Sequence, residues 1–304
     1  MSTNIFKNVL LIGGTGDTGK HILSALLADP VFNVTVLSRH NSTAKFPSNA
    51  QVIKVDYSDK NALTKALTGQ DVVISAVGGE GIDTNFGITL VEASIDAGVK
   101  WLIPSEFGGD YDDPFIDNIP VLASKPAIGK LLKENQSRIA HTFISPGIFL
   151  DWSFDNGFTG FDIANHTVTI YDEGKRRQSG TTLPNIAKAV VAILHHPEIA
   201  LNKRIFIANT TFSQQETLDY FEKETGIKWT VKHASSIETI KNAAEQLAQG
   251  KVMDAFVNYI RSAIYGDNKM FLFEGRTNNK ELGIPEIPLE RIIKEAVQRQ
   301  KISQ

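Results

Sequence analysis

Residues 12–19 read IGGTGDTG and directly follow the apolar run Val9–Ile12. The glycines fit the pattern G-x-G-x-x-G counted from Gly14, and G-x-x-G-x-x-G counted from Gly13. Between a strand and a helix, either pattern lets the backbone turn tightly and approach a phosphate, at which the N–H groups of the helix then point. The alternative is an ordinary strand-to-helix turn. A Walker-type triphosphate loop is excluded, because no Ser or Thr follows Lys20.

The first half of the chain alternates strand-like and helix-like segments. Its predicted strands are continuous apolar runs, which are typical of strands covered on both faces. Strands and helices at this spacing indicate βαβ units and a parallel sheet. We predict strands at Val9–Ile12, Val34–Leu37, Val52–Val55, from Asp71, from Lys100 and at His141–Ile144. We predict helices at Lys20–Ala28, Asp59–Leu67, Thr84–Ala97 and Pro126–Lys133.

The second half has a mixed pattern. The stretch TVTIYDEGKRR from Thr167 is typical of a hairpin, and Ser213–Glu216 and Ser235–Glu238 fit capping boxes that open helices. Further elements are predicted at Asn185–His195, Arg204–Ala208, Asp254–Ile264 and Leu289–Arg299. The predicted fold class is α/β, a Rossmann-type doubly wound parallel sheet with a smaller mixed α/β substrate domain. The boundary is placed near Leu150: residues 1–150, rejoined by part of 181–210, form the dinucleotide-binding domain, and residues 151–304 form the substrate domain.

The end of the second predicted strand distinguishes NAD from NADP. Proteins that bind NAD place an acidic residue there, about 20 residues beyond the glycines, for the ribose 2′-hydroxyl. Here the position holds Arg39, and no acidic residue occurs between Asp29 and Asp56. A guanidinium suits a 2′-phosphate, and Lys45 adds a second positive charge. The pattern favours NADP, with a solvated surface arginine as the alternative.

The remaining dinucleotide contacts are expected from the fold, because ligands of open α/β sheets bind at the carboxyl ends of the strands. Asp56 ends the third strand and is predicted to face the adenine edge, with Tyr57 beside it. Ala76, Val77 and Gly78 end the fourth strand and are predicted to pass under the adenosine ribose.

Composition narrows the classes of protein and of site. A net charge of −3 offers no electrostatic footprint for nucleic acid or an anionic membrane. Cysteine is absent, which excludes disulfides, thiolate metal sites and a cysteine nucleophile. No apolar stretch approaches the roughly 20 residues of a membrane span, and the N-terminal apolar run is too short for a signal peptide, so a cytoplasmic protein is expected. His195 and His196 lack suitably spaced partners, so no metal site is predicted.

The segments GGTGDTG, VTVLSR, KWLIPSEFGGD, a following lysine and ISPGIF occur in this order. In this they resemble the NmrA-like branch of the atypical short-chain dehydrogenases, and within it the isoflavone reductase and phenylcoumaran benzylic ether reductase group in a fungal-type version. The resemblance implies an NADPH-dependent reductase, with the nicotinamide between the PSEFG loop and the SPGIF segment. The cofactor-binding residues it implies there are Pro146 and Gly147, in addition to the glycine-loop residues Gly13, Thr15, Gly16, Asp17, Thr18 and Gly19.

Plant members of that family carry a lysine after PSEFG in the pattern K-x-x-[IV], and Lys125 matches it through Ile128. The resemblance implies that this lysine also contacts the cofactor and carries the acid–base role beside the nicotinamide; Lys130, a turn further on, is the competitor. Because Pro126 suits a first helical position, Lys125 is expected at a helix N-terminus, where the partial positive charge and an oxidised nicotinamide would lower its pKa. A solvated lysine is the alternative.

Two features concern the substrate side. Five aromatic residues fall between Phe149 and Phe161, of which Phe149 and Trp152 are predicted to contact a small, aromatic or enone-like substrate, and the others to form core. Tyr171 and Lys175 match the Y-x-x-x-K spacing of ordinary short-chain dehydrogenases, but the turn signals around Gly174 indicate a chance match.

Two functions remain open at this stage. One is a reductase that uses Lys125 as its acid–base residue. The other is a non-catalytic NADP(H)-binding redox sensor or regulatory protein of the NmrA type. The lysine match favours the enzyme, although a fold alone does not imply a function. Monomer and homodimer are both compatible with the sequence.

Overall fold

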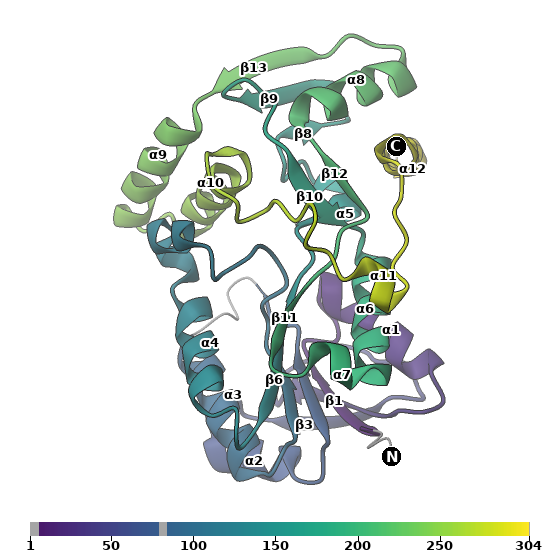
Figure 1. Ribbon diagram of the computed structural model, residues 1–304, viewed down its shortest axis with the longest axis vertical. Coiled ribbons are helices and arrows are strands. Elements are labelled where there is room, and N and C mark those ends of the chain that lie inside the picture. The colour runs from purple at the N-terminus through teal and green to yellow at the C-terminus, as the bar shows by residue number, and fades with distance from the viewer. Residues whose placement is uncertain (1–5, 79–83, 304) are drawn as a thin grey trace.

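A parallel sheet of seven strands forms the base of the molecule (Figure 1). The computed structural model describes residues 6–78 and 84–303. The strand order is β11-β6-β5-β4-β1-β2-β3, and every neighbouring pair is parallel. The strands are β1 (Asn8–Ile12), β2 (Asn33–Arg39), β3 (Gln51–Val55), β4 (Val72–Ser75), β5 (Trp101–Ile103), β6 (Ala140–Ser145) and β11 (Lys203–Phe206). The Rossmann-type sheet predicted from the alternating segments is confirmed.

The apolar strands are buried on both faces. Successive residues of β1 enter different cores: Val9 and Leu11 pack on one side of the sheet, Leu10 and Ile12 on the other. The first side is covered by α1 (Asp17–Ala28), α6 (Leu183–His195) and α7 (Pro197–Ala200). The second side is covered by α2 (Lys60–Leu67), α3 (Thr84–Asp96) and α4 (Ser124–Glu134).

The strand order reverses direction at β1, which pairs with β2 on one side and β4 on the other. The connection from β1 to β2 crosses one face of the sheet, and the connections from β4 to β5 and from β5 to β6 cross the other. A crevice therefore opens at the carboxyl ends of β1 and β4. This is the point at which open α/β sheets bind ligands. The glycine-rich loop lies there, between β1 and α1.

The upper part of the molecule in Figure 1 holds two small sheets and most of the remaining helices. One sheet joins β7 (Ile148–Phe149), β10 (Gln178–Thr181) and β12 (Thr210–Phe212). The other joins β8 (Phe161–Asp162), β9 (Thr167–Tyr171) and β13 (Thr230–Ala234). Its helices are α5 (Leu150–Asp155), α8 (Gln214–Thr225), α9 (Ser236–Ala248), α10 (Val252–Tyr265) and α12 (Leu289–Ser303). Helix α11 (Asn279–Leu282) lies lower and packs against α6.

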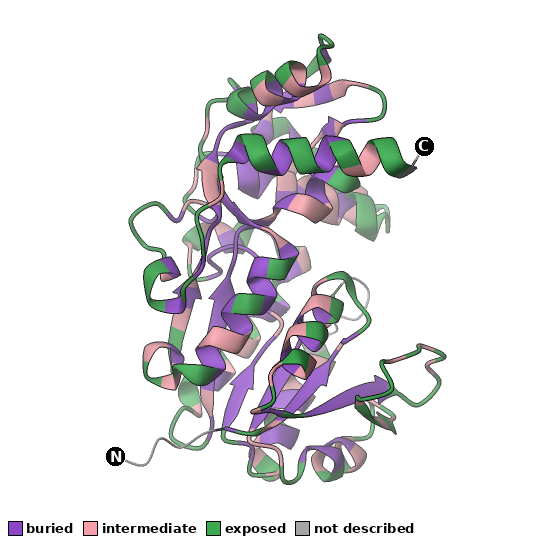
Figure 2. Cartoon of the chain, turned by 90° about the vertical axis from the view of Figure 1, so that its right-hand side faces the viewer, coloured by how far each residue is buried: buried purple, intermediate pink, exposed green. Residues whose placement is uncertain are grey.

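This part has a core of its own, in which Phe154, Phe161 and Phe221 meet edge to face and tilted. Figure 2 shows α12 lying across it with one buried and one exposed side. The later half of the chain also returns to the large sheet: β11 pairs with β6, and α6 packs against α1. The division near residue 150 remains a prediction.

Local expectations were corrected at four places. Helix α1 begins at Asp17 rather than Lys20, because the glycines at 16 and 19 leave its first turn free to wind close to the loop. Helix α4 begins at Ser124, continuing short 3₁₀ turns at Pro114–Asn118 and Pro120–Leu122, so Pro126 is its third residue rather than its first. The other two corrections concern the hairpin and the second capping box.

The hairpin predicted across TVTIYDEGKRR was wrong. A turn does form, with the Gly174 N–H donating to the Tyr171 carbonyl at 2.9 Å, but β9 and β10 enter different sheets. The hairpin partner of β9 is β8, with Phe161 opposite Val168. Pairing was decided by which sheet each strand could reach, which a local pattern does not contain.

Ser213 and Glu216 form the complete capping box predicted for α8. At α9 only half of the box forms: the Ser235 hydroxyl accepts from the Glu238 N–H, while the Glu238 carboxylate pairs with Lys241 at 2.8 Å. Within the described residues, no helix is both long and apolar enough to cross a membrane.

Candidate functional site

The glycine loop is a backbone cradle that side chains would fill. Gly13 has a φ of +82°, and a Cβ there would lie 2.7 Å from the Ala76 carbonyl oxygen. A Cβ on Gly19 would lie 2.0 Å from the Gly13 carbonyl oxygen. Both positions therefore require glycine, because the loop presses against the end of β4 and against the first turn of α1.

The N-terminus of α1 is open toward this cradle. Gly16 is the N-cap residue and has no side chain with which to satisfy the first N–H groups of the helix. Thr15 lies in the loop, and Asp17 and Thr18 lie in the first turn. Unsatisfied N–H groups and the positive end of a helix dipole fit a diphosphate. The loop thus passes the structural test for a dinucleotide.

A cavity of about 560 Å³ adjoins the loop between α1 and the segment after β2. Its described lining includes Gly14, Thr15, Lys20 and Lys45, and no carboxylate. Arg39 is the last residue of β2 and is exposed, outside that lining. A cavity lined by basic side chains and by no carboxylate suits the 2′-phosphate that NADP carries on its adenosine.

Asp56 and Tyr57 follow β3 and have protein partners. The Asp56 carboxylate accepts from the Ser58 N–H at 3.0 Å and from its hydroxyl at 2.7 Å, and these bonds lower the pKa of Asp56. The Tyr57 hydroxyl donates to the Leu37 carbonyl at 2.9 Å, and the ring stacks on Phe86. Burial raises the pKa of Tyr57 to about 12. The predicted adenine contacts of these two residues remain predictions.

The ends of β4 and β5 are joined beside the glycine loop. Ala76 donates its N–H to the Ile12 carbonyl at 2.9 Å, next to Gly13. The Ser105 hydroxyl, in the PSEFG loop after β5, donates to the Val77 carbonyl at 2.6 Å. The expected segment from Ala76 to Gly78 thus lies between the glycine loop and the PSEFG loop, although its contact with a ribose stays a prediction.

Lys125 lies at the centre of this group of loops. Its side chain is buried, with 5% of the residue exposed, and its Nζ donates to the Ser105 carbonyl. Burial lowers the pKa of Lys125 to about 8, against the opposing charge of Glu106. The direction agrees with the expectation, but the cause is burial rather than a helix terminus. The solvated alternative is wrong for Lys125 and right for Lys130, which is exposed and pairs with Glu134 at 3.9 Å.

Glu106 and Arg204 form a buried ion pair next to Lys125, which the sequence analysis did not identify. Glu106 is 2% exposed, and its Oε2 lies 3.0 Å from a guanidinium nitrogen of Arg204. Burial raises the pKa of Glu106, and the charges of Arg204 and Lys125 oppose that shift. Glu106, Lys125 and Arg204 together line a second cavity of about 430 Å³ beneath α4.

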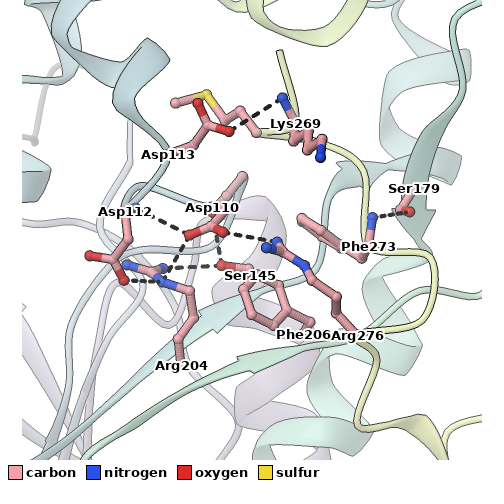
Figure 3. Close-up of polar contacts among 12 residues, drawn as sticks. Asp110, Asp112, Asp113, Ser145, Ser179, Arg204, Phe206, Lys269, Phe273 and Arg276 are labelled. Atoms are coloured by element: carbon pink, nitrogen blue, oxygen red, sulfur yellow. Dashed lines mark hydrogen bonds and ion pairs between the residues drawn. The ribbon is translucent and has the colours of Figure 1, made fainter.

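Arg204 also binds two further carboxylates (Figure 3). Its Nε lies 3.3 Å from Asp110 and 2.9 Å from Asp112, and its guanidinium lies over the Phe143 ring. Asp110 is bound in turn by Arg276 at 2.9 Å, and Asp112 by Lys133 at 2.7 Å.

The charge balance of this cluster bears on Lys125. Glu106, Asp110 and Asp112 are already matched by Arg204, Arg276 and Lys133. The lowered pKa of Lys125 therefore comes from its burial, and the charge of Glu106 opposes that shift. Glu106 could be noticed in the sequence as the acidic residue of PSEFG. Its partner Arg204 could not be predicted, because the sequence does not show that β11 lies beside β6 in the sheet.

The SPGIF segment meets the PSEFG loop, as the resemblance implied. The Gly147 N–H donates to the Gly108 carbonyl at 2.9 Å. Gly147 has a φ of +70°, and a Cβ there would lie 2.1 Å from the Ser179 carbonyl oxygen. The Pro146 carbonyl accepts from the Thr181 hydroxyl at 2.7 Å. The two loops are thus held together, while their contact with a nicotinamide is untested.

The aromatic residues after this segment divide into two groups. Phe154 and Phe161 are core residues with 1% exposure. Phe149 and Trp152 are half-buried at the carboxyl edge of the large sheet, and Trp152 packs against Phe158 with ring centroids 5.2 Å apart. These two residues are the candidate substrate wall, and their contact with a substrate remains a prediction.

The two chance matches occupy structural positions. Tyr171 is a buried residue of β9 that stacks on Tyr265, and Lys175 is exposed beside Glu173. His195 pairs with Asp29 at 2.7 Å. Among residues 6–78 and 84–303, no group of three or more His, Asp or Glu side chains is placed to hold a metal ion.

Comparison with known proteins gives matches along most of the chain. The sequence model of the NmrA-like family matches residues 6–281. The oxidoreductase aprR of Aspergillus flavus is 33% identical over 291 residues, which cover 94% of this chain and 97% of that protein. The bifunctional pinoresinol-lariciresinol reductase of Forsythia intermedia is 28% identical over 242 residues, which cover 72% and 76% of the two proteins. The structure of leucoanthocyanidin reductase with NADPH from Vitis vinifera superposes with a TM-score of 0.74 at 22% identity, covering 96% of this chain and 99% of that one.

Proposed function

The chain belongs to the NmrA-like family, and we propose that it is an NADPH-dependent reductase of a small aromatic, enone or ether metabolite, with Lys125 as its acid–base residue. Its general activity is that of an oxidoreductase, the class of its relative aprR. The finer proposal rests mainly on one observation. A buried lysine with a pKa near 8 lies at the carboxyl edge of the sheet, joined through Ser105 and Val77 to the glycine loop.

Three features support NADP(H) as the cofactor. The glycine cradle and the open N-terminus of α1 suit the diphosphate. Lys45 in the adjoining cavity and Arg39 at the end of β2 suit a 2′-phosphate, since no carboxylate stands there to bind a ribose hydroxyl. Solved structures of the same fold, such as that of leucoanthocyanidin reductase, hold NADPH.

When bound, NADPH supplies the hydride, and the protein supplies orientation and electrostatics. Lys125 holds a proton at Nζ close to neutral pH and is placed to pass it to the reduced substrate. The Ser105 carbonyl orients that Nζ, and Glu106 favours its protonated form. Phe149 and Trp152 provide apolar surface for a planar substrate.

Cofactor choice is tested by titrating the protein with NADPH and NADH and following the melting temperature. NADPH is expected to raise the melting temperature at concentrations at which NADH does not, because binding to the native state stabilises it by mass action. Equal shifts with both nucleotides would show that Arg39 and Lys45 do not read a 2′-phosphate.

The role of Lys125 is tested by following NADPH oxidation with a panel of aromatic enones, ethers and aldehydes. We expect Lys125→Met to lower kcat by about 10²-fold or more, the usual contribution of a positioned acid or base. NADPH affinity is measured in parallel, because the same lysine is expected to contact the cofactor. The matched control is Lys130→Met on the exposed face of the same helix, which should keep its kcat. Equal kcat values for both variants would remove Lys125 from the mechanism. Tight NADPH binding without turnover of any panel member would favour the sensor alternative.

A further inference from the structure

Asp17 makes a contact that reaches far along the chain. Its Oδ2 accepts from the indole Nε1–H of Trp152 at 2.8 Å, across 135 residues of sequence. Its Oδ1 lies 3.2 Å from the Nζ of Lys20 in the next turn of α1. The carboxylate therefore has one partner on its own helix and one on α5.

The position of this carboxylate raises an electrostatic problem. Asp17 is the first residue of α1, where the helix dipole favours a negative charge. A diphosphate bound by the same helix terminus would bring a second anion to that end. Two like charges close together at one helix end repel, and solvent screens this repulsion only in part because the Asp17 side chain is 56% exposed. The direction in which the Asp17 side chain points thus affects how well the loop accepts a diphosphate.

Trp152 is held in place independently of Asp17. Its ring packs on Phe158, and the preceding residue, Asp151, accepts from the N–H of Leu183 at 3.0 Å. Leu183 is the first residue of α6, which packs against α1. The short helix α5 therefore lies over the N-termini of two adjacent helices, with Asp151 bound to one and Trp152 to the other (Figure 1).

We propose that Trp152 is a positioning residue of the dinucleotide site, whose indole N–H holds the Asp17 carboxylate away from the diphosphate position. This inference rests on the proposed function only in requiring that the chain binds NADPH. It gives Asp17 a place in the loop without making it a phosphate ligand. It also means that α5, which carries Trp152 of the candidate substrate wall, affects how tightly the glycine loop binds the dinucleotide.

A double-mutant cycle tests the proposal by NADPH affinity, measured by calorimetry at low salt. Trp152→Phe keeps the ring and removes only the N–H donor, and we expect it to weaken binding about tenfold, the scale of one hydrogen bond to a charged group. Asp17→Asn removes the repelling charge and should bind NADPH at least as tightly as the parent protein. In the Asp17→Asn background, Trp152→Phe should have almost no further effect, because the charge it controls is gone.

Two controls separate positioning from packing. Trp229→Phe removes an indole from the core of the upper part, far from the loop in sequence, and should leave NADPH affinity unchanged. Adenosine 2′-phosphate lacks the diphosphate, so its affinity should not respond to Trp152→Phe. A loss of affinity for both ligands would indicate a packing defect and overturn the proposal.

The outcomes also separate this inference from the proposed function. If the parent protein binds no NADPH, the proposed function fails and the inference fails with it. If the parent binds NADPH but Trp152→Phe binds equally well, or loses the same factor with and without Asp17, only the inference is overturned.

Discussion

At the residue scale, Lys125 illustrates how position changes the chemistry of a side chain. Lys130, one turn later on the same helix, is exposed and pairs with Glu134. Lys125 is buried, bonds to the Ser105 carbonyl and has its pKa lowered to about 8 by burial, with Glu106 opposing. The two lysines differ because the elements packed around Lys125 bury it, whereas Lys130 faces solvent. A group with such a pKa can hold and release a proton near neutral pH.

This pKa predicts the pH dependence of turnover. Lys125 donates a proton in its charged form, so kcat should fall as pH rises through about 8. Glu106 favours the charged form, and Glu106→Gln should therefore move the midpoint of that fall to lower pH. The measurement is the pH profile of kcat under saturating NADPH and substrate. Glu290→Gln in α12, which breaks an exposed pair with Lys223, is the control and should leave the midpoint in place. A midpoint unmoved by Glu106→Gln would show that Glu106 does not act on the lysine.

At the element scale, the loop between β1 and α1 is the most tightly constrained connection near the site. Its glycines are required for different reasons: Gly13 by its positive φ and the nearby carbonyl of β4, Gly19 by the close approach of the helix to the loop. Gly16 is less constrained, since a Cβ there would lie 3.4 Å from the Gly13 carbonyl oxygen, an ordinary contact. The need for glycine therefore differs from one position of this short loop to the next.

Two alanine substitutions compare these positions. In Gly19→Ala the Cβ would lie 2.0 Å from a backbone oxygen, so the loop must shift, and we expect a loss of about 2 kcal/mol of unfolding free energy or more. Gly16→Ala should cost less than half of that. Thermal and urea unfolding without nucleotide measure both. Equal losses in the two variants would contradict the close approach of α1 to the loop.

At the scale of the whole molecule, the segment that follows α10 ties the C-terminal part to the site. The Asp110 N–H donates to the Met270 carbonyl at 2.7 Å, and the Phe273 N–H donates to the Ser179 hydroxyl at 2.9 Å. Arg276 lies over the Phe206 ring and bonds to Asp110, which also contacts Arg204 (Figure 3). The loop after β5 is thus held from β11 on one side and from this segment on the other.

Arg276→Ala tests that connection. It leaves the mostly buried Asp110 with one cation fewer and uncovers the Phe206 ring, so we expect a loss of about 2 kcal/mol in unfolding free energy. Arg291→Ala is the matched control, because its pair with Glu295 is exposed and should contribute at most about 0.5 kcal/mol. Urea unfolding measures the two losses. A loss no larger than that of the control would mean that the segment is not held by Arg276.

The sequence by itself determined the features that depend on near neighbours. Apolar runs between helices predicted the parallel sheet, and the glycines placed the phosphate loop between a strand and a helix. Ser213 and Glu216 predicted the cap of α8. Such features follow from backbone conformation and from burial on both faces, which a few adjacent residues decide.

Only the tertiary structure decided which distant segments meet. It separated β9 from β10, brought Arg204 on β11 to Glu106, and set Trp152 against Asp17. It also buried Lys125 and left Lys130 in solvent, although both lie on one helix. Each of these contacts joins residues far apart in sequence through the packing of whole elements. A local pattern carries no information on that packing, because the same strand or helix can face several partners until the chain has closed on itself.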